Sequence, residues 1–187
     1  MKTIKTLSLI FSSIVVLGLT SCSNDDDNNV EPVNEEEVIT TLIVTFTSDG
    51  NPTVVMTFDD PSGDGSSEPV VTVTNPFVSG ATYQGTVEVL NRTESPIEDI
   101  TEEVEEEDTE HQFFFIAGGG LDVTTQYENF DGNGNPLGTR ISLVAGAASS
   151  GIYTVILRHD LNKPNDGTLA DAGGETDISA TFDATVQ

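Results

Sequence analysis

Residues 178–186 read ISATFDATV, so that an apolar residue alternates with a polar one along the whole segment. Because successive side chains of a β-strand point to opposite faces, this alternation is typical of a strand with one face in a core and the other in water. The same period of two recurs from Val38 onward, in segments 41–47, 53–58, 71–74, 82–89, 111–117, 121–127, 141–145 and 152–158. The pattern therefore predicts about nine short strands.

Turn-forming residues separate these segments. Residues that tolerate a positive φ occur at 48–52 (SDGNP), 118–120 (GGG), 133–134 (NG) and 149–151 (SSG). Short strands with turns every 8–12 residues or so favour an all-β fold, an antiparallel β-sandwich of immunoglobulin-like architecture. A small barrel, in which one sheet closes on itself, is the alternative.

One segment departs from the strand pattern. Ser95 is a candidate N-cap, Pro96 suits the first helical position, and Glu98 completes a capping box, which together predict one short acidic helix. Its apolar stripe consists of Ile97, Ile100 and Val104. Most of the remaining side chains are carboxylates, and like charges four residues apart weaken a helix. We therefore expect the stripe to hold the helix over one open end of the sandwich, or a cation to stabilise it.

The N-terminus resembles a lipoprotein signal. Lys2 and Lys5 precede an apolar run at 7–19, which is too short to span a membrane. The residues that follow, Leu19-Thr20-Ser21-Cys22, resemble the lipobox of bacterial lipoproteins, in which the peptidase cuts before the cysteine and its sulfur carries diacylglycerol. The predicted organisation is a signal peptide at 1–21, a lipidated and disordered acidic tether at 22–36, and a β-sandwich domain at 37–187.

The acidic stretch after the cysteine bears on location. Residues 23–29 read SNDDDNN, which resembles the stretch that marks surface-exported lipoproteins of the Bacteroidota. The sequence thus predicts a protein anchored in the outer membrane by the lipid on Cys22 and facing the cell surface.

Charge and cysteine content exclude several classes of partner. Lys and Arg number 6 and Asp and Glu 32; two of the six, Lys2 and Lys5, lie in the signal segment, so the rest of the chain carries −28 (four basic against 32 acidic). Such a chain repels nucleic acid, because phosphate binding needs basic residues, and its natural partners are cations or basic surfaces. Cys22 is the only cysteine, so no intrachain disulfide and no cysteine-based zinc site can form.

Two histidines suggest a metal site. His111 opens one predicted strand directly after the acidic helix, and His159 ends another directly before a long loop, residues 160–176. If the intervening strands alternate up and down, both histidines lie at one pole of the sandwich. Imidazole and carboxylate ligands suit zinc, copper or iron, and two histidines could also hold haem iron. The candidate ligands for a divalent metal ion or haem are His111, His159, Glu107, Glu110, Asp160 and Glu175.

Two acidic loops are weaker candidates for calcium. Residues 59–65 supply Asp59, Asp60 and Asp64 beside glycines, and residues 131–135 place oxygen ligands at alternate positions as in an EF-hand loop. The second loop departs from that pattern, because Pro136 stands where the pattern has glycine and Ser142 where it has glutamate. Loops of this composition are also common without an ion.

Enzyme and glycan-binding signals are absent from the sequence. There is no G-x-S-x-G, P-loop or H-E-x-x-H motif. With no Trp and only three Tyr, the chain has little to offer a sugar ring. The prediction is therefore a binding or structural protein rather than an enzyme.

Several segments together resemble a known group of proteins: residues 38–42, residues 100–114, and residues 157–177 with their LRH, NKPN and ADAGGETD motifs. They resemble small flavobacterial lipoproteins labelled "type 1 periplasmic binding fold superfamily protein". The resemblance covers nearly the whole mature chain and implies no catalytic residue. The label implies a two-domain α/β architecture of about twice this length, whereas the periodicity predicts one all-β domain.

Two functional hypotheses follow. The first is an outer-membrane lipoprotein that binds a metal ion or metal complex, as an accessory to an outer-membrane transporter. The alternative is a structural or adhesive β-sandwich module of the cell surface, with or without stabilising calcium.

Overall fold

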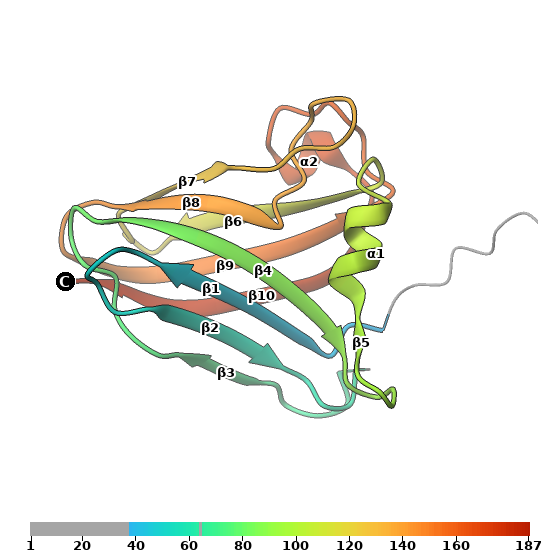
Figure 1. The fold of residues 1–187 in the computed structure, drawn as a ribbon, viewed down its shortest axis with the longest axis horizontal. Coiled ribbons are helices and arrows are strands. Elements are labelled where there is room, and N and C mark those ends of the chain that lie inside the picture. Colours follow the sequence, from blue (N-terminus) through green and yellow to red (C-terminus); the bar gives the residue numbers. More distant parts are fainter. Residues whose placement is uncertain (1–37, 64) are drawn as a thin grey trace, which may run out of the picture. The chain divides into compact units, whose positions relative to one another are not determined.

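The computed structural model describes residues 38–63 and 65–187, whose strands form two antiparallel sheets packed face to face (Figure 1). The larger sheet has the order β3-β2-β1-β4-β8-β7, with bounds β1 (Thr41–Thr47), β2 (Val54–Asp59), β3 (Val70–Val73), β4 (Thr82–Asn91), β7 (Val123–Tyr127) and β8 (Arg140–Ala145). The short β5 (Glu98–Asp99) pairs with the end of β4. The smaller sheet has the order β10-β9-β6, with β6 (His111–Gly118), β9 (Ser149–His159) and β10 (Glu175–Val186). The prediction of an all-β antiparallel sandwich is confirmed.

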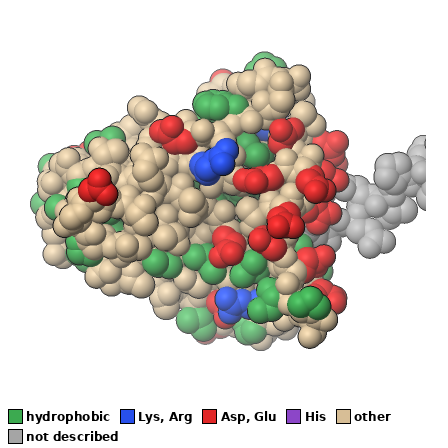
Figure 2. All heavy atoms as spheres, viewed as in Figure 1, with side chains coloured by type: hydrophobic (Ala, Val, Ile, Leu, Met, Phe, Trp, Pro, Cys, Tyr) green, Lys and Arg blue, Asp and Glu red, His purple; other side chains and the backbone are tan. Residues whose placement is uncertain are grey.

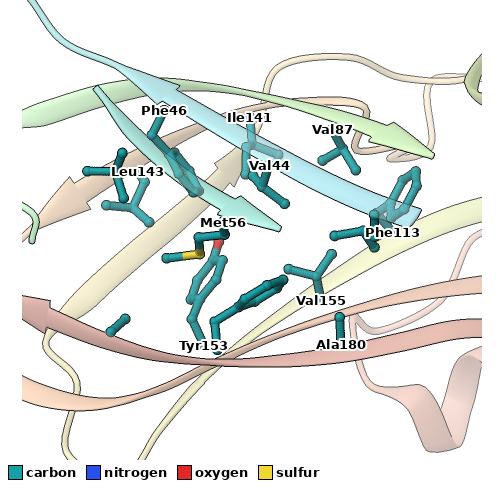
Figure 3. Packing of buried hydrophobic residues seen from close by; sticks show 14 of the residues in the cluster. Val44, Phe46, Met56, Val87, Phe113, Ile141, Leu143, Tyr153, Val155 and Ala180 are labelled. Carbon is teal, nitrogen blue, oxygen red and sulfur yellow. The ribbon is translucent and has the colours of Figure 1, made fainter. Parts of the chain in front are cut away.

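The core lies between the sheets and consists mainly of residues that the alternation placed on inner faces, together with Phe77, Leu137 and two residues of the acidic helix, Ile100 and Val104 (Figure 3). In β10 the apolar residues of the alternating segment are buried, and the Ser, Thr and Asp between them are exposed or half-buried. The aromatic rings of Phe46, Phe77 and Tyr83 meet edge to face, with centroids 5.2 Å apart in each contact. Burial of each large apolar side chain contributes roughly 1.5–3 kcal/mol, so this interleaved layer is the main source of stability.

The acidic helix exists, but the predicted start is wrong. Helix α1 spans Ile100–Glu106, and Asp99 rather than Ser95 is its N-cap, accepting a 3.0 Å hydrogen bond from the Thr101 amide. The residues just before it extend as β5 along β4, so the capping box at 95–98 is not used, and Ile97 is 57% exposed. Of the proposed stripe, only Ile100 and Val104 are buried. They fix α1 across one end of the sandwich (Figure 1).

The long loop after β9 is folded rather than open. It contains a second, unpredicted helix, α2 (Leu169–Ala172), and the Asn162 amide donates to the Ala172 carbonyl at 2.8 Å. A second apolar cluster forms beneath it, made of Phe114, Ile156, Leu161 and Ala172, with Leu169 partly buried against it. Phe114 faces this cluster while Phe113, its neighbour, faces the main core. The loop is therefore a cap on the outer face of the smaller sheet.

Some of the sequence predictions fall on residues 1–37 and 64. The signal peptide, the lipidated Cys22, the tether and Asp64 lie outside the described residues. Within the described part, neither helix has the length and apolar character needed to cross a membrane.

Candidate metal centre

The register of β6 and β9 sets His111 directly opposite His159. Their rings stack with centroids 4.3 Å apart and an interplanar angle of 21°. Both residues are buried, with relative exposures of 0% for His111 and 3% for His159. The two histidines thus lie side by side at the end of the sandwich that carries α1, the arrangement expected from strands that alternate in direction.

His111 lies between the end of α1 and β10. Its Nδ1 is 3.3 Å from the carbonyl oxygen of Glu107, and its Nε2 is 4.0 Å from Oδ2 of Asp177. The Asp177 side chain is only 6% exposed, so this carboxylate lies inside the domain beside the imidazole. Sequence analysis missed Asp177, because the residue sits where the β9–β10 register shifts between Thr176 and Ile178. Such a bulge re-aims a side chain, and simple alternation does not reveal it.

His159 faces two carboxylates at the surface. Its Nε2 is 3.9 Å from Oε2 of Glu110 and 3.8 Å from Oδ1 of Asp160, whose side chains are 56% and 60% exposed. Asp160 has a φ of 50°, and among the described residues other than glycine it alone has a positive φ. This sparsely populated conformation turns the chain at the end of β9 and leaves the carboxylate beside the ring.

The predicted ligands fall into two groups that share one histidine. Glu107, His111 and His159 form the first group, and Glu110, His159 and Asp160 the second; within each, one donor atom per residue lies within 4.8 Å of the others. Around a zinc ion with bonds of about 2.0–2.2 Å, donor atoms stand roughly 3–3.5 Å apart, so the side chains of either group would have to move closer together to share an ion. Glu175 is opposite His159 in β10 but belongs to neither group.

Haem fits this geometry poorly. Two axial histidines stand on opposite faces of a porphyrin and point their nitrogens at the iron between them. Here the rings stack face to face at 4.3 Å, and neither side chain is more than 4% exposed. The donor set suits a small divalent ion.

In the loop at 131–135, Asp131 is paired with a lysine from another segment, Lys163. Asp131 Oδ1 accepts hydrogen bonds from the amides of Asn133 and Asn135 at 2.9 and 2.8 Å, and Oδ2 lies 3.6 Å from Nζ of Lys163. The two side chains of this ion pair are 0% and 4% exposed. Burial raises the pKa of Asp131, but the hydrogen bonds from Asn135 and Asn133 and the charge of Lys163 outweigh it, so the pKa lies below its ordinary value. The Lys163 ammonium group thus lies beside the carboxylate that the sequence analysis considered as a weak candidate ligand for calcium.

The described carboxylates of the loop at 59–65, Asp59 and Asp60, also have partners within the domain. Asp60 Oδ1 accepts from the Ser62 hydroxyl at 2.6 Å, and Oδ2 accepts from the Gly65 amide at 3.0 Å. These bonds, led by the one from the Ser62 hydroxyl, lower the pKa of Asp60. Asp59 accepts from Thr41 at 2.7 Å and lies 3.6 Å from Arg92. In the described part of the loop, both carboxylates thus already have partners.

Acidic side chains dominate the surface around α1. Figure 2 shows them gathered at the end of the domain that carries α1 in Figure 1. Glu102, Glu103, Glu106, Glu107 and Glu110 are exposed there. Their summed field draws cations toward the histidine pair and raises the local concentration of any divalent ion.

Comparison with known proteins yields no relative: no family model, curated protein or solved structure matches the chain.

Proposed function

We propose that this chain is a lipid-anchored outer-membrane protein whose β-sandwich binds a divalent transition-metal ion and serves as an accessory to an outer-membrane transporter. One observation carries the proposal: the β6–β9 register stacks His111 on His159, and Glu107, Glu110 and Asp160 each place a carboxylate oxygen within 4.8 Å of a histidine nitrogen. Imidazole and carboxylate together favour zinc or copper over calcium, which prefers oxygen ligands alone.

The surroundings of the histidines support a metal rather than a bare polar edge. A histidine that binds a metal commonly directs its second nitrogen toward a carboxylate or carbonyl, which fixes the ring. His111 has a partner of each kind, the Glu107 carbonyl at 3.3 Å and the Asp177 carboxylate at 4.0 Å. If Nε2 faces the ion, the Glu107 carbonyl holds the ring through Nδ1; the Asp177 carboxylate, at 4.0 Å, is too far for a hydrogen bond and would act through its charge.

The proposed location in the outer membrane is supported by the sequence alone. Leu19-Thr20-Ser21-Cys22 supports lipid attachment, and the acidic residues at 23–29 support export to the cell surface. An acidic, metal-binding domain on such an anchor would collect ions close to an outer-membrane transporter.

The test is a calorimetric titration of the purified protein with zinc and then copper(II), with metal content measured on the same sample. We expect about one ion per chain. We also expect His111→Gln and His159→Gln each to weaken binding by at least about tenfold, equivalent to 1.4 kcal/mol. Melting curves without metal verify that each variant folds.

Glu107 and Glu106 provide a matched pair, because both are exposed and adjacent at the end of α1. Only Glu107 belongs to a ligand group. Glu107→Gln should weaken zinc binding, and Glu106→Gln should leave it unchanged. Absence of zinc and copper binding in the wild-type protein would refute the proposal.

The second candidate is the structural or adhesive module. It is favoured by the internal pairing of Asp60 and Asp131, which lets both acidic loops hold their shape without an ion. This candidate requires a melting temperature that neither chelator nor added metal changes, whereas a metal-binding protein melts higher in the presence of its ion.

A further inference from the structure

At the edge where β3 and β10 lie, the larger sheet extends beyond the smaller sheet. β3 is one edge strand of the larger sheet and β10 is one edge strand of the smaller sheet (Figure 1). Val71 pairs with Phe58 and Val73 with Met56, whose side chain is fully buried, so Val71 and Val73 belong to the inner face of the larger sheet. Val71 is nevertheless 42% exposed. The smaller sheet therefore lacks a strand that would cover the inner face of β3.

A groove occupies the place of that strand. Two adjoining hollows share Val73 and Asp183; one extends along Val71 and Thr181, and the other reaches Thr185. The inner face of β3 forms its floor and the edge of β10 its wall. Asp183 is exposed and is the one charged side chain among the described residues that line it.

The chain itself begins to fill the groove and then leaves it. The Phe77 amide donates to the Thr185 carbonyl at 2.8 Å, and the Gln187 amide donates to the Phe77 carbonyl at 2.8 Å, a parallel pairing with the end of β10. In the described part of the chain this is the only pairing on the outer side of β10. Residues 178–183, about 20 Å of strand at 3.3 Å per residue, therefore present an open edge.

We propose that this groove binds an extended segment of another protein, which adds to the edge of β10 as a fourth strand of the smaller sheet. Main-chain hydrogen bonds to an open edge provide affinity in such strand addition, and alternate side chains provide selectivity. One face of the bound strand would place apolar side chains on Val71 and Val73. A Lys or Arg on its opposite face would pair with Asp183.

Charge identifies the class of occupant. A second copy of this chain would bring its own net charge of −26 against the first. The segment before β1 holds Glu31 and Glu35 to Glu37, which Asp183 would repel. An alternating apolar and basic strand from a different protein is the occupant that this groove complements.

The experiment uses two synthetic eight-residue probes, one alternating Lys with Val and the other alternating Glu with Val. Each is titrated into the purified protein while amide resonances are followed by NMR. We expect the Lys–Val peptide to shift resonances at 71–73 and 178–183, to slow hydrogen exchange there, and to bind at least about tenfold more tightly than the Glu–Val peptide, equivalent to 1.4 kcal/mol.

Two matched pairs of variants test whether the peptide binds in the groove between β3 and β10. Asp183→Lys and Glu88→Lys change the net charge equally at exposed strand positions, one inside the groove and one on β4. Val71→Asn and Val70→Asn alter adjacent exposed residues on opposite faces of β3. The first member of each pair should weaken binding of the Lys–Val peptide, and the second should not.

Four results would overturn the proposal. They are absence of binding, equal binding of the two peptides, equal losses from Asp183→Lys and Glu88→Lys, and sedimentation as a dimer that Val71→Asn disrupts. The last result would assign the groove to a second copy. Since Val71 is already partly exposed, the Asn variant should fold, and Val71→Thr is a milder replacement if its melting curve shows otherwise.

Discussion

Lys163 donates a 2.6 Å hydrogen bond from Nζ to the carbonyl oxygen of Asp108. This contact joins the loop after β9 to the turn between α1 and β6, which carries Glu107 and Glu110. Because the ammonium also lies 3.6 Å from the Asp131 carboxylate, one buried cation connects three segments around the histidine pair.

Loss of that cation should destabilise the whole domain. Lys163→Met leaves Asp131 buried beside no positive charge, and breaking a buried pair in this way costs about 3 kcal/mol. Burial also lowers the pKa of Lys163, an effect that Asp131 partly offsets. Urea denaturation measures the cost. The double variant Lys163→Met/Asp131→Asn should recover part of it, and equal losses in the single and double variants would contradict the interpretation.

The same pair gives a pH dependence with a definite sign. The folded-state pKa of Asp131 lies below its ordinary value of 3.8, so the folded state binds fewer protons than the unfolded chain between the two values. Its stabilising effect is then complete above pH 3.8 and is lost as pH falls through the folded-state pKa. The stability difference between wild type and Asp131→Asn should therefore be constant near neutral pH and shrink below pH 3.8.

Denaturation curves at pH 7 and pH 3 test this expectation. Comparing two variants at each pH removes the general relief of repulsion that acid brings to a chain of net charge −26. A difference that stays constant down to pH 3 would show that the Asp131 charge has no stabilising role.

Gly174 fixes the chain beside His159. A Cβ at this position would collide with the His159 carbonyl oxygen and with the Leu161 backbone, and its φ of +69° is unfavourable for other residues. Gly174→Ala should lower the melting temperature and weaken zinc binding together. Gly167→Ala is the control: its φ is +85°, but no atom lies within 4 Å of the added Cβ. If the control loses as much stability, the collision is not the cause.

Helix α1 should become more stable when its charge is reduced. Glu106→Lys replaces repulsion from Glu102 by attraction at a four-residue spacing and places a cation in the last turn, with a gain of about 0.5–1 kcal/mol. Both side chains are exposed, so 1 M salt should remove most of the gain. Urea denaturation at low and high salt measures both effects, and a gain that survives high salt would contradict the electrostatic explanation.

Much of the fold follows from local pattern. The alternation at 178–186 and in segments such as 141–145 identified the buried faces, because a strand with one face in the core admits one register of apolar residues. The start of α1 did not follow, since Ser95 to Glu98 and Asp99 to Glu102 are both capping patterns. Strand pairing of Glu98 and Asp99 with β4 decided between them.

The site was predictable only in part. Strand alternation led to the histidine pair, and three of the four carboxylates predicted beside it, Glu107, Glu110 and Asp160, fall in the two ligand groups. Asp177 and Lys163 depend on contacts that local sequence does not encode. A bulge sets the direction of the Asp177 side chain. The loop after β9, which folds onto its own apolar cluster, sets the position of Lys163. A side chain that reaches a site from a distant segment has no sequence spacing to reveal it.

β1, the first strand of the domain, lies between β2 and β4 rather than at an edge. Any pull transmitted from the N-terminal side of the chain therefore enters the sandwich through a strand that is hydrogen-bonded along both sides. Such a load runs along the strand and stretches both ladders at once, instead of peeling an outer strand one bond at a time. A force applied before β1 would therefore have to break hydrogen bonds to β2 and to β4 together.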